Sequence, residues 1–262
     1  MQQKTLQILK DQYDTDTLCI SVDGQFAGSA IKIPYPVRSM NASTIEETGG
    51  NNLQFKRFYN RFYWGYDFAE NTIGSLLYGK HIKIARQLRS NMLKIKPGSS
   101  VLSVACGTGG DFEYIPPAVL STLHIVGLDI SEGMVRQCRK KFKKWNTGID
   151  LFVGSAEDLP FNDNSFDTVF SFGGINFFNS PQKAVRELIR VAKPGTRVFF
   201  GDETELIIKG SYQELPLLKQ FFKGKEFQIN PLSWVPRTVK NPAYHTLWDG
   251  KMYVVSCEKG KH

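Results

Sequence analysis

Hydrophobic and polar positions follow two alternating periods over most of the chain, and they predict strands and helices in turn. Short apolar runs rich in β-branched and aromatic residues predict strands at residues 100–105, 124–129, 150–153, 168–172 and 197–201. Apolar positions at helical spacing predict helices near 75–94, over 132–145 and over 181–192. Strands that alternate with helices favour right-handed crossovers, so these elements predict an α/β fold with a parallel sheet covered on both faces.

The C-terminal part of the chain has a different pattern. Two apolar runs, 244–248 and 251–257, flank the pair Asp249-Gly250. An Asp-Gly pair between two such runs is a strong signal for a β-hairpin. We therefore predict that an antiparallel hairpin follows the five parallel strands.

The first fifty residues differ from the rest. Alternation predicts two short strands, at 18–22 and 30–33, joined by a turn that starts at Asp23-Gly24. A polar stretch with a Gly-Gly pair then predicts a linker over 39–52. We divide the chain into a small N-terminal segment or degenerate module with its linker, 1–50, and a main domain, 51–262. Three roles are open for the N-terminal segment: formation of a homodimer, substrate holding, or covering of a sheet edge.

A dense aromatic block follows the linker. Phe55, Phe58, Tyr59 and Phe62 lie at i, i+3, i+4 and i+7, the spacing of an amphipathic helix. One interpretation is a helix buried against the domain, and the other is an aromatic lid over a ligand pocket. The two interpretations are compatible.

Composition excludes several classes of protein. The chain has 262 residues, of which 41% are hydrophobic, so intrinsic disorder is excluded. No apolar run reaches the ~18 residues of a membrane span, and the N-terminus lacks the apolar stretch of a signal peptide. The four cysteines are isolated from one another, which disfavours a zinc site or disulfides and fits the cytoplasm. We expect a soluble cytoplasmic protein without a bound metal.

The positive charge raises the question of an anionic partner. Lys and Arg exceed Asp and Glu by 33 − 25 = +8. A basic cluster falls on the helix predicted over 132–145, where a solvated face is the expected role and contact with nucleic acid or an anionic membrane is the alternative. Its members are Arg136, Arg139, Lys140, Lys141, Lys143 and Lys144.

The strongest chemical signal is a glycine-rich turn after the first predicted strand of the sheet, at residues 105–110. Glycines there let the backbone approach a ligand, at the place where doubly wound sheets bind nucleotides. Asp129 ends the next strand, 20 residues beyond Gly109 (129 − 109 = 20). A carboxylate at that position can accept both hydroxyls of a ribose. The alternative is that Asp129 only begins the following helix.

Further segments complete a recognisable series. Residues 101–110 (VLSVACGTGG), 127–131 (GLDIS), 154–161 (GSAEDLPF) and 190–195 (RVAKPG) together resemble the class I S-adenosylmethionine-dependent methyltransferases. The resemblance extends over about residues 55–258 and is strongest to the branch of the ubiquinone and menaquinone C-methyltransferases. It implies a Rossmann-like, seven-stranded mixed sheet that ends in the hairpin. It also implies S-adenosylmethionine as cofactor.

The resemblance assigns site residues by position. The cofactor-binding residues it implies are Tyr66, Ala105, Cys106, Gly107, Thr108, Gly109, Asp129, Ile130, Ser155, Ala156, Glu157, Ser171 and Phe172. Two positions depart from the family pattern, because Ser103 replaces the usual acid and Ala105 replaces the first glycine. The C-terminal signature of a quinone methyltransferase is not evident, so the acceptor is left open.

The expected reaction is direct in-line transfer of the methyl group to a small apolar or aromatic acceptor, at carbon, oxygen or nitrogen. Such a transfer needs an aligned nucleophile, exclusion of water and sometimes a base. No catalytic triad is therefore expected, and the candidate bases by position are His245, Asp202 and Glu203. The candidate acceptor-binding residues are Phe58, Tyr63, Asn176 and Trp234.

Three other functions are alternatives to this reaction. A nucleic-acid methyltransferase of base amino groups would carry an Asn/Asp-Pro-Pro-aromatic motif where this chain has residues 171–174 (SFGG), so nucleic acid is not the expected partner. A nicotinamide oxidoreductase is disfavoured by the terminal hairpin. A non-catalytic scaffold that retains the cofactor pocket remains an alternative.

Overall fold

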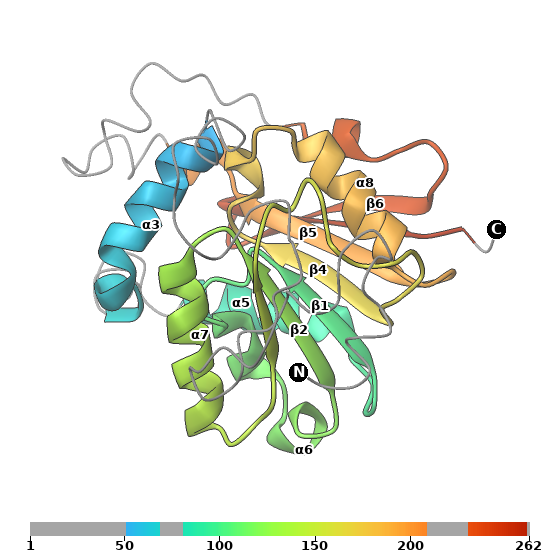
Figure 1. Cartoon of the computed structure of the whole chain (residues 1–262). Coiled ribbons are helices and arrows are strands. Elements are labelled where there is room, and N and C mark those ends of the chain that lie inside the picture. Colours follow the sequence, from blue (N-terminus) through green and yellow to red (C-terminus); the bar gives the residue numbers. More distant parts are fainter. Residues whose placement is uncertain (1–50, 69–80, 209–229, 261–262) are drawn as a thin grey trace.

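The fold is described from a computed structural model, which places residues 51–68, 81–208 and 230–260 (Figure 1). One seven-stranded sheet runs through it in the order β3-β2-β1-β4-β5-β7-β6, with β1 to β5 parallel and β7 antiparallel to both β5 and β6. The strands are β1 Ser100–Val104, β2 His124–Asp129, β3 Asp150–Val153, β4 Thr168–Phe172, β5 Arg197–Glu203, β6 Lys240–Leu247 and β7 Met252–Glu258. The predicted α/β class, with a mixed sheet and a C-terminal hairpin, is confirmed.

Helices cover both faces of this sheet (Figure 1). The longer ones are α3 Asn51–Phe68, α5 His81–Leu93, α7 Glu132–Lys144 and α8 Pro181–Val191. Shorter turns are η3 Gly110–Tyr114, α6 Pro117–Leu120, η4 Ile175–Phe177, α9 Glu205–Ile207 and η6 Pro231–Trp234. One apolar core lies between the sheet and α8, and a second lies between the sheet and α5, η3 and α7.

Two local signals in the sequence account for the start of α7 and for the hairpin turn between β6 and β7. Ser131 caps α7, because its hydroxyl accepts the backbone N–H of Met134 at 3.3 Å. The hairpin turn places Trp248 at φ 53° and Asp249 at φ 50°, followed by Gly250 at φ 80°. Left-handed residues match the twist of the two strands, which is why the Asp-Gly pair predicted the hairpin.

Some predictions fall on residues that the structure does not describe. They are the two strands at 18–22 and 30–33, the linker as far as residue 50, and the start of the helix predicted near 75–94. The segment 209–229, expected to contribute to acceptor binding, also lies outside the described residues, as does Cys19.

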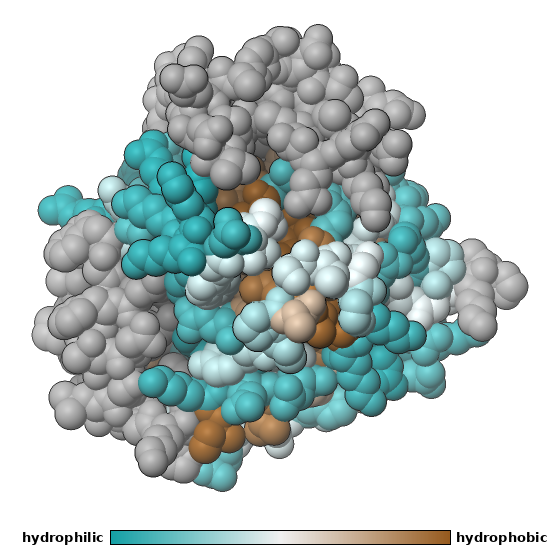
Figure 2. Space-filling model, turned by 90° about the horizontal axis from the view of Figure 1, so that it is seen from below, coloured by the Kyte–Doolittle hydropathy of each residue, from teal (hydrophilic) through white to brown (hydrophobic). Residues whose placement is uncertain are grey.

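The surface seen from below in Figure 2 is mainly hydrophilic, with apolar atoms visible at its centre and along one margin. On α7, Arg136, Lys140, Lys143 and Lys144 are exposed, whereas Lys141 forms an ion pair with Glu113 at 2.7 Å. Within the described ranges, no helix combines the length and the apolar character needed to cross a lipid bilayer.

Candidate functional site

The turn after β1 has an unusual backbone. Ala105, Gly107 and Gly109 have φ angles of 54°, 53° and 81°, so three of five consecutive residues are left-handed. Glycine accepts this conformation readily, whereas a residue with a Cβ pays about 1 kcal/mol for it. At Gly109 a side chain is also sterically excluded, because a Cβ there would lie 2.9 Å from the sulfur of Cys138 on α7. The turn is therefore held close to both the sheet and α7.

Asp129 joins this turn to the start of α7. It ends β2 and is only 7% exposed. Its Oδ2 accepts the backbone N–H of Gly107 at 2.9 Å, and its Oδ1 accepts that of Ser131 at 2.8 Å. Burial raises the pKa of Asp129 to about 6, against the opposing effect of these hydrogen bonds. At neutral pH the carboxylate is charged, and each oxygen retains a lone pair for a ligand.

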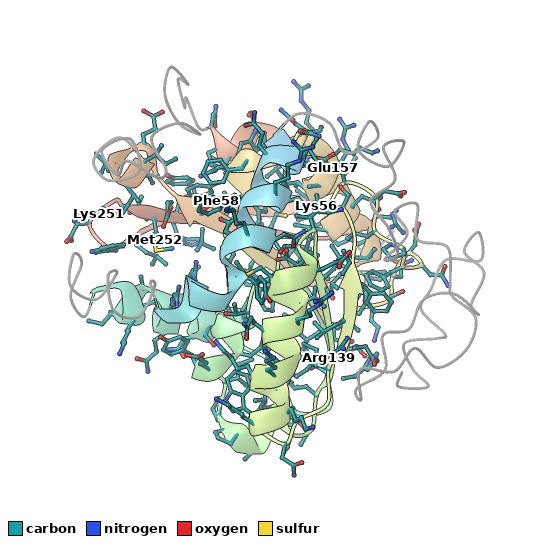
Figure 3. The ribbon with its side chains drawn as sticks, turned by 60° about the vertical axis from the view of Figure 1, so that its left-hand side comes forward. Lys56, Phe58, Arg139, Glu157, Lys251 and Met252 are labelled. Atoms are coloured by element: carbon teal, nitrogen blue, oxygen red, sulfur yellow. The ribbon has the colours of Figure 1, made fainter. Side chains whose placement is uncertain are left out.

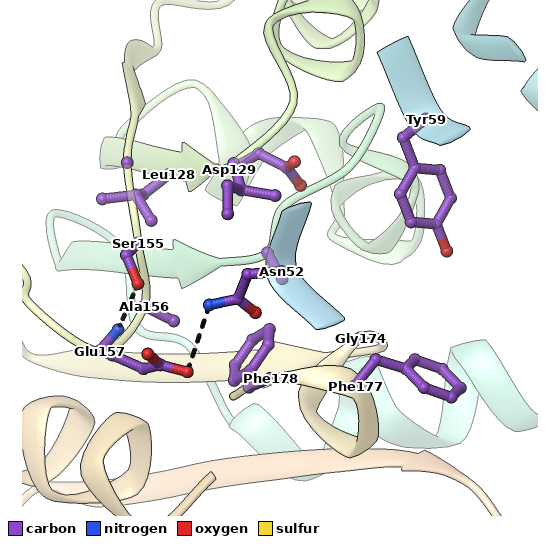
Figure 4. Close-up of a pocket in the computed structure, with 13 residues that line it drawn as sticks. Asn52, Tyr59, Leu128, Asp129, Ser155, Ala156, Glu157, Gly174, Phe177 and Phe178 are labelled. Carbon is purple, nitrogen blue, oxygen red and sulfur yellow. Dashed lines mark hydrogen bonds between the residues drawn. The ribbon is translucent and has the colours of Figure 1, made fainter. Parts of the chain in front are cut away.

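A first cavity opens beside Asp129 (Figure 4). Its empty volume is about 550 Å³, open solvent included. The end of β2, the segment after β3, α3 and η4 all contribute to its wall. The lining residues are Asn52, Tyr59, Ala105, Leu128, Asp129, Ile130, Gly154, Ser155, Ala156, Glu157, Gly174, Phe177 and Phe178.

A second cavity adjoins the first along the glycine-rich turn. The two share Tyr59, Ala105, Asp129 and Gly174, so together they form one elongated site. The second cavity has an empty volume of about 620 Å³. Its remaining lining residues are Arg86, Arg89, Cys106, Gly107, Thr108, Gly110, Asp111, Met134, Phe172 and Gly173.

Helix α3 closes over the first cavity by hydrogen bonds near its start. Asn52 donates through Nδ2 to Glu157 Oε1 at 3.4 Å (Figure 4). Asn52 and Asn179 also exchange two hydrogen bonds, each from a backbone N–H to the other's side-chain oxygen at 3.3 Å. Glu157 is further anchored by the backbone N–H of Ser180 at 2.8 Å. These contacts tie α3 to the segments after β3 and η4.

The middle of α3 packs on the first turn of α7. Asn60 Oδ1 accepts the hydroxyl of Ser131 at 2.7 Å and the backbone N–H of Gly133 at 3.2 Å. Lys56 is buried, which lowers its pKa, while the charge of Glu132 opposes that effect. Figure 3 shows α3 crossing the N-terminal end of α7. The helix therefore covers the cavities, as the lid interpretation of the aromatic block requires.

The contact between α3 and α7 depends on a glycine. A Cβ at Gly133 would lie 2.7 Å from the ring of Tyr63. We expect Gly133→Ala to push α3 away from α7, since overpacking costs about 1–3 kcal/mol. Hydrogen exchange of the backbone amides of residues 51–63 should become faster, while that of β1 and β4 should not change. Adding Tyr63→Ala should restore part of the protection, and unchanged exchange in the single variant would contradict this packing.

Most of the predicted cofactor residues come together. Those that line one or both cavities are Ala105, Cys106, Gly107, Thr108, Asp129, Ile130, Ser155, Ala156, Glu157 and Phe172. Gly109 lies within the turn but lines neither cavity. Ser171 is buried on the face of β4 opposite Phe172, because successive strand residues point to opposite faces. Tyr66 lies on α3, and its side chain is outside the described part of the structure.

Cys106 packs between the turn and α7. A hydrogen bond with Cys138, together with burial, raises the pKa of the Cys106 thiol well above its ordinary value. The thiol is therefore protonated at neutral pH and is a poor nucleophile. This fits a packing role for Cys106.

The predicted acceptor residues lie in different places. Phe58 packs edge-on against Tyr59, with ring centroids 5.4 Å apart, and Tyr63 lies against Gly133. Asn176 accepts a hydrogen bond from the hydroxyl of Tyr253 at 2.6 Å. Trp234 packs at the core beside α8, with its ring 6.3 Å from that of Phe200. None of these four residues lines the two cavities.

The candidate bases also lie outside the two cavity walls. Asp202 is buried and accepts the backbone N–H groups of Asn176 at 3.1 Å and Glu203 at 2.9 Å. Burial raises the pKa of Asp202 to about 6. Asn176 donates through its side chain to the backbone oxygen of Glu203 at 2.7 Å, and His245 contacts the hydroxyl of Ser256 at 3.2 Å. The carboxylate of Asp202 and the backbone of Glu203 therefore lie next to η4, whereas His245 lies within the hairpin.

Sequence reasoning did not single out several lining residues. They are Asn52, Tyr59, Arg86, Arg89, Asp111, Met134, Phe177 and Phe178. Tyr59 belonged to the predicted aromatic stripe, so its periodicity was the available signal. Burial, with Asp202, Glu203 and Asp129 nearby, raises the pKa of Tyr59, so its hydroxyl is protonated at neutral pH.

Comparisons with known proteins agree with this geometry. Residues 102–200 match a family model described as a methyltransferase domain. The chain is 41% identical over 113 residues to the demethylmenaquinone methyltransferase of Renibacterium salmoninarum, a match that covers 43% of this chain and 45% of that relative. It is 32% identical to the enzyme of that name from Listeria welshimeri, over 61% of this chain and 70% of the relative. For the Staphylococcus aureus relative, identity is 31% over 68% and 69% of the two chains.

Solved structures support the fold. A SAM-dependent methyltransferase from Thermotoga maritima superposes with a TM-score of 0.56 at 19% identity, over 78% of this chain and 99% of that one. The [4+2]-cyclase SpnF superposes with a TM-score of 0.53 at 14% identity, over 67% and 81%. At such identities the likeness shows the fold alone, so the activity follows from the sequence relatives. The chain belongs to the class I S-adenosylmethionine-dependent methyltransferases, in the branch of the demethylmenaquinone methyltransferases, and S-adenosylmethionine is its cofactor.

Proposed function

We propose that this protein methylates a ring carbon of a hydroxylated aromatic acceptor of the demethylmenaquinol type. The observation that carries the proposal is an aromatic wall that runs along the two adjoining cavities, with Phe177 and Phe178 in the first, Phe172 in the second and Tyr59 in both. An apolar aromatic wall favours a flat apolar acceptor over a sugar or a peptide. The names of the sequence relatives support the same class of acceptor.

The residues present fit the cofactor. The carboxylate of Asp129 offers two acceptor oxygens for the hydroxyls of a ribose, and the segment 154–156 lies beside it for an adenine ring. The glycine-rich turn lines the adjoining cavity, where the amino-acid end belongs. When bound, S-adenosylmethionine supplies a methyl group on a positively charged sulfur, which is already a strong electrophile. The protein then has to align the acceptor and exclude water.

Each part of the aromatic wall has a separate role in this proposal. Tyr59 lines both cavities and, as a protonated phenol, separates the acceptor from solvent on the α3 side. Phe177 is the last residue of η4 and Phe178 follows it, while the backbone N–H of Asn176 in η4 donates to the buried carboxylate of Asp202. We assign Asp202 as a positioning residue for η4. With the cofactor bound, the ring carbon of the ionised acceptor would supply the electron pair for the new bond, S-adenosylhomocysteine would leave, and the ring proton would pass to water.

The test is an activity assay with reduced acceptors. Purified protein is incubated with S-adenosylmethionine and a demethylmenaquinol that carries a short prenyl tail. Release of S-adenosylhomocysteine is measured, together with the mass and the methylation site of the product. We expect turnover with the naphthoquinol and none with its oxidised quinone, because only the quinol supplies electrons to the methyl group.

Parallel reactions separate the alternatives. Benzoquinols, simple phenols and amines test other acceptor classes, and a reaction without acceptor gives the background. Methylation of an amine or a phenol oxygen in place of the naphthoquinol carbon would overturn the proposed acceptor. Binding of S-adenosylmethionine without turnover of any acceptor would favour the scaffold function.

A further inference from the structure

Helices α3 and α7 carry exposed cations next to the cavities. On α3, Arg57 and Arg61 are exposed and lie about one helical turn apart. The exposed cations of α7 are Arg136, Lys140, Lys143 and Lys144. Because α3 packs on the first turn of α7 (Figure 3), we treat these six residues as one surface, the basic face.

Little negative charge offsets the basic face. The two helices contain nine Lys and Arg residues and only two acids, Asp67 and Glu132 (9 − 2 = +7), in a chain whose net charge is +8. Glu132 is already engaged, since its carboxylate lies 3.5 Å from Arg136 and its charge also acts on Lys56. An excess equal to nearly the whole net charge is therefore gathered on the two helices that adjoin the site.

Arg139 of α7 adds an unsatisfied cation beside this face (Figure 3). Its Nη2 atom is buried and has no hydrogen-bond partner among the residues that the structure describes. Burial, together with the charge of Arg136, lowers the pKa of Arg139. An unpaired buried donor on a charged group is unfavourable, and an anionic oxygen of a partner would satisfy it.

Aromatic side chains accompany the cations on α3. Phe58 stands between Arg57 and Arg61 in the sequence, is half-buried, and packs against Tyr59 with ring centroids 5.4 Å apart. Tyr59 in turn lines both cavities, so α3 links the basic face to the site. Aromatic rings beside cations are typical of segments that lie at a membrane–water interface.

We propose that the basic face docks on an anionic lipid bilayer, with Arg139 bound to a lipid phosphate, so that α3 lies against the membrane that holds the acceptor. The choice of a bilayer over another polyanion rests on the proposed function, because an apolar acceptor with a prenyl tail partitions into lipid. Each cation close to an anionic membrane strengthens binding about fivefold, and the attraction falls off within a Debye length.

The first test is cosedimentation of the full chain with vesicles. One set contains phosphatidylcholine alone, and the other contains phosphatidylcholine mixed with phosphatidylglycerol. We expect binding to the anionic vesicles only, and its loss at about 1 M salt, where the Debye length falls to about 3 Å. Absence of binding to the anionic vesicles, or equal binding to both sets, would overturn the proposal.

Nucleic acid is the alternative partner for a basic surface. A duplex DNA oligonucleotide is therefore titrated at the same salt and at the same concentration of negative charge as the anionic vesicles. The protein should bind the vesicles more tightly. Tighter binding of the DNA would overturn the choice of a bilayer.

The second test removes cations from each helix in turn. The double variants are Arg57→Gln with Arg61→Gln on α3, and Lys140→Gln with Lys143→Gln on α7. Each should bind anionic vesicles about 10- to 30-fold more weakly, from the loss of two cations near the lipid. Both should keep the parent affinity for S-adenosylhomocysteine in solution, which shows that the fold is intact. Since the two helices are altered separately, a folding defect in one variant leaves the other as the test.

The matched control removes the same charge from the opposite face of the sheet. Lys183 and Arg186 are exposed on α8, which packs on the face away from α7. Lys183→Gln with Arg186→Gln should bind anionic vesicles as tightly as the parent protein. Equal weakening in all three double variants would mean that net charge alone determines binding, and it would contradict docking through the basic face.

Arg139 is tested against its neighbour Arg136. The Arg136 side chain is 66% exposed and already pairs with Glu132. Arg139→Gln should therefore weaken vesicle binding by a larger factor than Arg136→Gln does, because only Arg139 offers a desolvated donor to a phosphate. Effects of equal size would contradict a phosphate bound at Arg139.

None of these measurements includes an acceptor. Turnover of a short-tailed quinol without vesicle binding would refute the docking and leave the proposed methylation standing. Vesicle binding without turnover would do the reverse. The two proposals therefore fail separately.

Discussion

Asp129→Asn is expected to weaken binding of S-adenosylhomocysteine by about 100-fold at neutral pH, because a hydrogen bond to a charged group contributes about 1.5–3 kcal/mol. The carboxylate is buried between Gly107 and Ser131 and is the acceptor we assign to the ribose hydroxyls. An asparagine keeps the shape but has one oxygen in place of two. The measurement is calorimetric titration with S-adenosylhomocysteine, with NADH as a negative control.

Asparagine is preferable to alanine at this position. Alanine would leave the N–H groups of both Gly107 and Ser131 without an acceptor, whereas asparagine keeps the acceptor for one of them. The matched control is Asp150→Asn, since Asp150 is similarly buried at the start of β3 and lines neither cavity. If Asp129→Asn bound the ligand as tightly as the parent protein, the ribose assignment would be wrong.

The raised pKa of Asp129 gives this result a pH signature. Burial moves the pKa of Asp129 from 3.8 to about 6, so the carboxyl is protonated in more acidic solution. Ribose hydroxyls favour the charged form, and affinity should therefore fall by up to about tenfold per pH unit below pH 6. Asp129→Asn should remove this dependence, and an equally steep profile in the variant would assign the titration to another group.

The pH dependence of stability has the opposite sign to the pH dependence of ligand affinity. The folded pKa values of Asp129 and Asp202 both lie near 6, above the ordinary aspartate pKa of 3.8. The folded protein without ligand therefore holds more protons than the unfolded chain between about pH 4 and 6. From these two groups, the free energy of unfolding should fall as the pH rises through that window and level off above it. Saturating S-adenosylhomocysteine should offset the part that belongs to Asp129.

We expect the second large effect, a loss of stability, from Gly201→Ala. Gly201 lies in β5 opposite Val254 of β7, and a Cβ on Gly201 would overlap the backbone oxygen of Tyr253. Backbone cannot move aside as a flexible side chain does, so the two strands must separate locally. We expect the free energy of unfolding to fall by about 3 kcal/mol or more. Urea denaturation measures this directly.

A glycine with room beside it gives the control for that experiment. At Gly110 the nearest atom to a Cβ is Arg86 Nη1 at 3.7 Å, an ordinary contact distance. Gly110→Ala should therefore leave the urea midpoint almost unchanged. A similar loss of stability in both variants would mean that the close approach of β5 and β7 does not determine the effect.

Much of the sheet could be predicted because its strands are short, apolar and bounded by turn residues. The bounds of β2, β3 and β4 agree with the prediction to the residue. β5 extends two residues further, through Asp202 and Glu203, because antiparallel pairing with β7 continues past the apolar run. β6 begins at Lys240, before its apolar residues, since an edge strand tolerates polar residues and Pro242.

The site was predictable where chain spacing determines it. The turn after β1 and Asp129 are brought together by the pairing of β1 with β2, and both are marked by residue type. Arg89 carries no such mark, because its burial depends on how α5 packs against η3 and Phe172. Trp234 was predicted to bind the acceptor, but it packs at the core beside α8. Aromatic character alone does not indicate which face of the sheet a side chain will contact.

The left-handed alanine at position 105 has a consequence for the whole site. Its methyl group lies at the junction of the two cavities, 3.7 Å from where a Cβ at Gly174 would be. Glycine there would relax the backbone, so the chain forgoes roughly 1 kcal/mol of stability to retain one methyl group. That methyl belongs to the wall that the two cavities share. Stability and the shape of this shared wall are therefore opposing requirements at one position.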